Sequence, residues 1–132
     1  MRIVRWLLVP PAAFAAWVGA LLLGLAGINA LDALCPPDLM ISGVCTAAWH
    51  PPAMRVLEAV CAAVAAAGVV VAPALIAPAY RVAVATICFF AGAAFAVFMA
   101  WAGGLWIALA AAALSGTTVW YVCVRRWRAV AS

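Results

Sequence analysis

The stretch "WLLVPPAAFAAWVGALLLGLAGI", residues 6–28, contains no charged side chain. An α-helix of about 20 apolar residues crosses the roughly 30 Å hydrocarbon layer of a bilayer. The alternation of apolar and polar residues that is typical of a membrane β-strand is absent from it. The stretch therefore predicts a membrane-spanning helix.

Three more stretches of the same kind follow, at residues 56–76, 82–101 and 105–124. The chain is 73% hydrophobic and 8% charged, whereas soluble domains are roughly 45–50% apolar and about 25% charged. The connections between the last three stretches are short, which favours antiparallel neighbours. We expect an all-α membrane protein with a single domain over residues 1–132. Its four transmembrane helices would form an antiparallel bundle, with one external loop, residues 29–55, between the first two.

The beginning of the chain would also fit a signal peptide, because Arg2 and Arg5 precede an apolar run. That run exceeds the roughly 7–15 residues of a signal-peptide core. We therefore expect the first stretch to be retained as a membrane span.

The arginines predict the orientation. With four spans, six of them fall on one side of the membrane: Arg2, Arg5, Arg81, Arg125, Arg126 and Arg128. Short loops rich in Lys or Arg stay in the cytoplasm, so both termini are expected inside and the loop outside. A chain with 36 alanines and no lysine suggests a GC-rich bacterial genome, and hence the bacterial inner membrane.

Most tryptophans lie near predicted span ends, where indole rings favour the headgroup region. We expect them to be interfacial anchors: Trp6, Trp49, Trp101, Trp106, Trp120 and Trp127.

No carboxylate, histidine or lysine lies in the middle of a span. An intramembrane charge is costly and usually functional, so its absence weighs against an ion-coupled carrier. Glu58 lies about one turn inside the second span, three residues after Arg55. That spacing brings two side chains together on a helix, which predicts a local ion pair at the membrane surface.

The stretch "CPPDLMISGVCTAAWHPP", residues 35–52, is the longest polar interruption. Cys35 and Cys45 would lie in an oxidising compartment, where paired thiols become disulfides, and the intervening prolines, Asp38 and glycine favour turns. Asp38, Trp49 and His50 are expected on the loop surface. The spacing C-x9-C-x4-H lacks the close cysteine pair of zinc sites, so no metal is expected.

Small residues recur at every fourth position in three spans, which allows helices in lipid to approach closely. The positions are Ala59, Ala63 and Ala67; Gly92, Ala96, Ala100 and Gly104; and Ala108, Ala112 and Gly116.

Common catalytic and phosphate-binding motifs are missing, so an enzyme is not the favoured interpretation and no cofactor is expected. The basic tail "RRWR", residues 125–128, is too short to indicate nucleic-acid binding. The favoured function is an accessory or structural subunit of a larger membrane complex, in contact with the lipid bilayer and with other membrane proteins or a second copy.

Two alternatives stay open. One is a membrane thiol–disulfide or quinone-linked oxidoreductase that uses Cys35 and Cys45. Four-span enzymes of that kind use a C-x-x-C pair, which this sequence lacks. The other is a small carrier or permeability protein with Arg55 and Glu58 at its mouth.

Overall fold

The computed structural model describes residues 2–131, with side chains from residue 3 to residue 129. The chain begins with a short helix, α1 (Arg2–Leu7), followed by α2 (Val9–Ala33). A compact connection contains η1 (Pro37–Leu39), β1 (Met40–Ile41) and β2 (Val44–Cys45). Three long helices complete the chain: α3 (His50–Ile76), α4 (Arg81–Gly103) and α5 (Trp106–Ala131).

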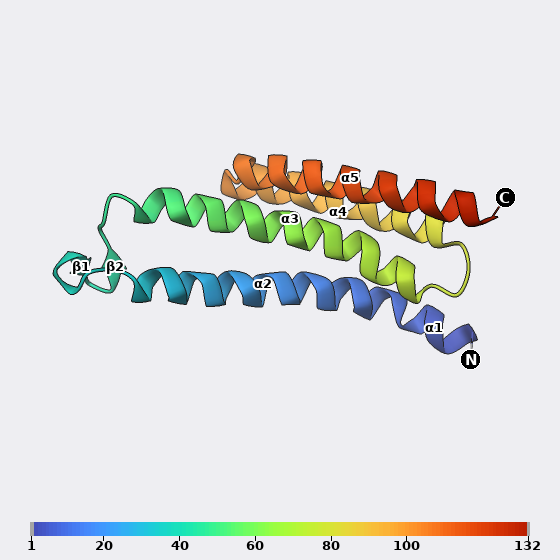
Figure 1. Cartoon of the computed structure of the whole chain (residues 1–132), viewed down its shortest axis with the longest axis horizontal. Helices are drawn as coiled ribbons and strands as arrows, with labels where there is room; N and C mark the ends of the chain where they lie inside the picture. The colour runs from blue at the N-terminus through green and yellow to red at the C-terminus, as the bar shows by residue number, and fades with distance from the viewer. Residues whose placement is uncertain (1, 132) are drawn as a thin grey trace.

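Four helices in the described part of the chain are long and apolar enough to cross a membrane, so the predicted all-helical architecture with four such segments is confirmed. The first of these segments runs from Ile3 to Ala33 and includes α1, which is bent away from the axis of α2 in Figure 1.

The helices extend beyond the apolar stretches from which we predicted the spans. α3 begins at His50 rather than near Val56, because Pro51 and Pro52 occupy its first turn. Proline is tolerated there, since the first N–H groups of a helix have no intrahelical partner. With α2 continuing to Ala33, the connection between the two helices is residues 34–49, shorter than the predicted loop 29–55.

α3 is the central helix. It packs against α2 on one side and against α4 and α5 on the other, and α4 and α5 also pack against each other. Figure 1 shows this order, with successive long helices running in opposite directions and both termini at the same end. The β1–β2 hairpin lies at the other end, where α2 and α3 extend past the turn between α4 and α5.

Small residues bring α2 and α3 close together. A Cβ atom built on Gly68 would lie 3.1 Å from the Cβ of Ala16, and one on Gly24 would lie 3.5 Å from the Sγ of Cys61. These contacts allow the two backbones to approach along much of their length. α3 and α5 are joined by a hydrogen bond that the Ser115 hydroxyl donates to the Ala63 carbonyl, at 2.8 Å.

The packed core lies toward the end that carries the termini. It is formed by Val70, Ala74 and Ala85, and Phe89, Val119, Trp120 and Trp127 pack around them. Trp120 and Trp127, which we predicted as interfacial anchors, thus pack partly buried against the core instead of being fully exposed.

The helix phase turns Trp120 inward, toward α4. Its ring stacks on Phe89 with centroids 5.5 Å apart, and its Nε1 donates to the Thr86 hydroxyl at 3.0 Å. Trp6, Trp49, Trp101 and Trp106 are exposed, as anchors would be.

Candidate functional site

The connection between α2 and α3 is a disulfide-closed hairpin. Cys35 and Cys45 form the predicted disulfide, with Cα atoms 6.0 Å apart. Met40 pairs with Cys45, and Ile41 pairs with Val44. The two turn residues, Ser42 and Gly43, both have positive φ, at 52° and 81°, which is the requirement of a type I′ hairpin turn.

A second set of hydrogen bonds closes the base of the hairpin. The Leu39 carbonyl accepts from the Thr46 backbone N–H at 3.0 Å and from the Thr46 hydroxyl at 2.8 Å. The Leu39 N–H in turn donates to the Pro36 carbonyl at 3.0 Å. The hairpin is thus held by one covalent link and several hydrogen bonds, even though each strand is only two residues long.

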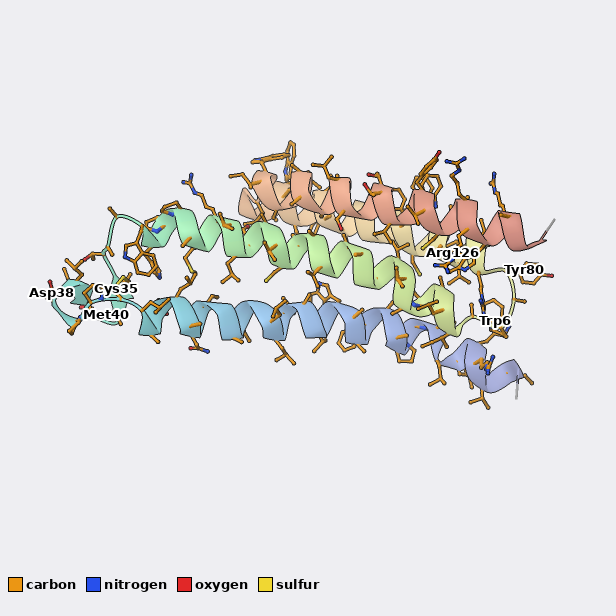
Figure 2. All side chains as sticks on the ribbon, in the orientation of Figure 1. Trp6, Cys35, Asp38, Met40, Tyr80 and Arg126 are labelled. Carbon is orange, nitrogen blue, oxygen red and sulfur yellow. A yellow bond between two sulfur atoms is a disulfide. The ribbon has the colours of Figure 1, made fainter. Side chains whose placement is uncertain are left out.

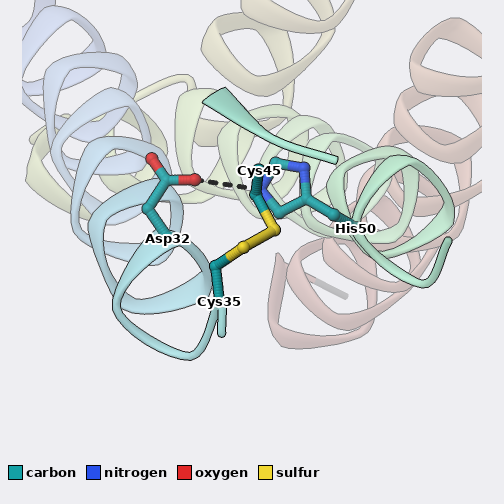
Figure 3. Close-up of polar contacts among 4 residues, drawn as sticks. All are labelled: Asp32, Cys35, Cys45 and His50. Carbon is teal, nitrogen blue, oxygen red and sulfur yellow. Dashed lines mark hydrogen bonds and ion pairs between the residues drawn. A yellow bond between two sulfur atoms is a disulfide. The ribbon is translucent and has the colours of Figure 1, made fainter. Parts of the chain in front are cut away.

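Asp32 and His50 join the last turn of α2 to the first residue of α3. His50 Nε2 lies 2.9 Å from Asp32 Oδ1, and since an ionised carboxylate only accepts hydrogen bonds, Nε2 is the donor. Figure 3 shows this pair beside the disulfide. The His50 side chain is only 12% exposed, so the prediction that it belongs to the loop surface is wrong. It is held inward by its hydrogen bond to Asp32 and by the Trp49 ring, whose centroid lies 5.7 Å from that of the imidazole.

The outer surface of the hairpin is apolar. We call the exposed side chains of Leu39, Met40, Ile41 and Val44 the hairpin tip; Ile41 and Val44 are each 62% exposed. Asp38 is exposed beside it, and so is Trp49. Figure 2 shows Asp38 and Met40 at the far end of the molecule, with Cys35 just behind them.

Arg55 and Glu58 do not form the predicted ion pair. The one ion pair among the described residues joins His50 to Asp32. Glu58 Oε1 is buried without a hydrogen-bond partner, whereas Arg55 is exposed. The two residues instead line a cavity of about 310 Å³ between α2 and α3, together with Gly24 and Cys61.

A larger groove begins at Glu58 and runs between the long helices. Its volume is about 790 Å³, and α2, α3, α4 and α5 all contribute to its wall. Small side chains of α3, among them Ala62, Ala65 and Ala66, form one wall. Trp17 of α2 and Phe95 of α4, in edge contact at 6.1 Å between ring centroids, also line it. Among the described lining residues, Glu58 is the one with a formal charge.

The three remaining cysteines do not take part in a disulfide. Cys61, Cys88 and Cys123 are free thiols within the long helices. Between residues 2 and 131, no group of three or more His, Cys, Asp and Glu side chains is placed to hold a metal ion.

The end opposite the hairpin is basic. Figure 2 shows Arg126 at this end together with Trp6 and Tyr80. Arg81 donates to the Ala77 carbonyl at 3.3 Å, and the guanidinium of Arg125 lies 5.5 Å from the centroid of the Tyr121 ring. Arg5 and Arg128 belong to the two terminal helices. The side chain of Arg2 lies outside the described residues.

The described chain thus has the architecture of a multi-pass membrane protein, with one structured hairpin at one end and a basic surface at the other. No protein-family model, no curated protein and no solved structure matches this chain.

Proposed function

We propose that this protein is an accessory subunit of a larger membrane complex and that the hairpin tip is the surface that binds its partner. The observation that carries the proposal is a contiguous apolar surface on a rigid hairpin. Ile41 and Val44 are exposed, while the disulfide and the bonds between Thr46 and Leu39 fix the backbone beneath them. Exposed apolar patches with a polar rim are typical of interaction sites.

The hairpin lies beyond the expected surface of the membrane rather than within it. Trp101 and Trp106, exposed on either side of the turn between α4 and α5, indicate the headgroup level at this end. Glu58 lines the same groove as Met99 and Leu105 next to that turn. From Glu58 back to His50, α3 rises by about 12 Å, so the hairpin projects into the aqueous space. An apolar tip in that position favours a protein partner over lipid.

The charges support an orientation with the hairpin outside the cytoplasm. Arg81 and the arginines of the two terminal helices lie at the opposite end, and positive charge favours the cytoplasmic side. A disulfide persists in an oxidising compartment, which agrees with this orientation. The bacterial inner membrane, with both termini in the cytoplasm, is our proposed location.

The two alternative functions have weaker support. A redox enzyme needs an accessible disulfide, whereas here Cys45 is only 4% exposed and Cys35 is half-buried, and the three free cysteines belong to the long helices. A carrier for hydrophilic solutes needs a polar path, yet the groove below Glu58 is lined almost entirely by apolar side chains.

The test is affinity purification of the tagged full chain in mild detergent, with protein mass spectrometry. We expect a stoichiometric companion that is lost in the double variant Ile41→Ser, Val44→Ser. The matched control is Leu34→Ser, which changes an exposed apolar residue outside the hairpin tip and should retain the companion. A wild-type protein that purifies alone as a monomer contradicts the proposal, as does a companion that both variants retain.

A further inference from the structure

We infer that the outer face of α5 is a binding site for an anionic phospholipid. The phosphate is bound by Arg125 and Arg128, and an acyl chain lies along the helix from there toward the middle of the bilayer. This site is at the end opposite the hairpin tip and does not depend on the proposed function.

The exposed face of α5 has the order of a phospholipid. Its side chains follow spacings of four, three and four positions, which place them on one side of a helix, and all of them are exposed: Leu114, Thr118, Tyr121 and Arg125. The Thr118 hydroxyl donates to the Leu114 carbonyl at 2.7 Å, so it is satisfied within the helix. From Leu114 to Arg125 the helix rises by about 16 Å, close to half of the roughly 30 Å hydrocarbon layer. The face is therefore long enough for one leaflet and ends at a cation.

The arginines lie at the expected phosphate level. On α5, Arg126 follows the exposed Trp106 by 20 positions, a rise of about 30 Å. On the antiparallel α4, Arg81 precedes the exposed Trp101 by the same 20 positions. Exposed tryptophans favour the headgroup region, so both helices cross one hydrocarbon thickness and reach the other headgroup region at an arginine. Figure 2 shows Arg126 at this end, away from the hairpin.

Arg125 is oriented toward the membrane. Helical side chains lean toward the N-terminus of their helix, which for the last turns of α5 is the direction of the bilayer. The Arg125 guanidinium lies 5.5 Å from the centroid of the Tyr121 ring, one turn nearer the membrane. Arg128 follows three positions later and is also exposed, and residues three apart on a helix are neighbours. The two guanidinium groups can therefore share one phosphate, which each matches with paired N–H donors.

The charge at this end selects an anionic lipid over a zwitterionic one. The three acids of the chain are Asp32, Asp38 and Glu58, in the last turn of α2, in the connection and in the first turns of α3. None of them belongs to the end where Arg81 and Arg126 add to the positive charge. Phosphatidylglycerol brings a net negative charge, whereas the ammonium of phosphatidylethanolamine cancels the charge of its phosphate.

The test uses the full chain, stripped of lipid in detergent and then offered phosphatidylglycerol or phosphatidylethanolamine with the same acyl chains. Native mass spectrometry counts the retained lipids. We expect a preference of about ten-fold or more for phosphatidylglycerol, which falls as the ionic strength rises. Arg125→Gln should lower the retention of phosphatidylglycerol about five-fold, and Arg125→Gln with Arg128→Gln should lower it further. The matched control is Arg55→Gln, which removes the same charge from an exposed position near the hairpin and should leave retention unchanged.

A pair of variants at Tyr121 tests the position of the guanidinium. Tyr121→Leu removes the ring beside Arg125 and should lower retention about two-fold, whereas Tyr121→Phe keeps the ring and should retain the lipid. Equal retention of the two lipids by the wild type overturns the proposal. So does a loss in Arg55→Gln as large as that in Arg125→Gln, or a companion protein that covers this face and is released when Arg125 and Arg128 are replaced.

Discussion

Replacing Cys35 and Cys45 by serine should open the hairpin without unfolding the helices. The two cysteines are ten positions apart, and a cross-link that closes a loop of this size stabilises it by about 3 kcal/mol on the chain-entropy model. The helices on either side are held independently, because α2 and α3 pack closely where Gly68 meets Ala16. The loss should therefore be confined to residues 34–49.

Amide hydrogen exchange is the appropriate assay, because it reports the free energy of local opening. The amides to follow are those of Leu39 and Thr46, which donate within the hairpin. A loss of about 3 kcal/mol should increase their exchange by about two orders of magnitude, while the amides in the middle of α3 stay protected. Cys61→Ser, at a free cysteine, is the control and should leave the hairpin unchanged. Hairpin protection that survives in the double variant, or a loss spread evenly over α3 and α5, would refute this reasoning.

Three further changes test the packing between helices. Gly68→Leu should lower the free energy of unfolding by about 1–3 kcal/mol through overpacking. The control is Gly19→Leu, which should be neutral because a Cβ atom at Gly19 meets nothing within 4 Å. Thermal unfolding in detergent measures both variants. Ser115→Ala removes the hydrogen bond to α3 and should cost about 0.6 kcal/mol in the same assay. Asp32→Ala leaves the partly buried His50 without its acceptor and should cost about 1 kcal/mol, measured as faster amide exchange in the first turns of α3. Unchanged stability in Gly68→Leu or Ser115→Ala, or unchanged amide exchange in Asp32→Ala, would contradict the contacts on which these predictions rest.

The features that the sequence predicted correctly depend on residues close together in the chain. The first long helix is recognisable at residues 6–28 because an uncharged apolar run of that length is typical of a helix that can cross a membrane. Cys35 and Cys45 are recognisable as a disulfide because both lie in one short connection with turn residues between them. The expectation of a membrane helix follows from composition, and the expectation of a disulfide follows from the short spacing of the two cysteines.

The features that the sequence did not reveal depend on helix phase and on contacts between distant residues. Asp32 and His50 are 18 positions apart, and they meet only because the end of α2 lies beside the beginning of α3. Glu58 follows Arg55 at a spacing that suggested a pair, yet its buried oxygen faces the interior of the packing. Trp120 looked like an interfacial residue from its position near a span end, and only the rotation of α5 places it on Phe89.

The groove illustrates why small residues alone do not predict close packing. The stretch at residues 61–68, "CAAVAAAG", presents small side chains in several directions around α3. Where Gly68 faces another small residue, Ala16, the two helices touch. Ala62 and Ala65, in contrast, line the groove together with the Trp17 and Phe95 rings, which are in edge contact. A small residue alone therefore does not determine whether two helices touch, because the contact depends on what the fold places opposite it: Ala16 opposite Gly68, the Leu57 side chain opposite Gly27, and the groove beside Ala62 and Ala65.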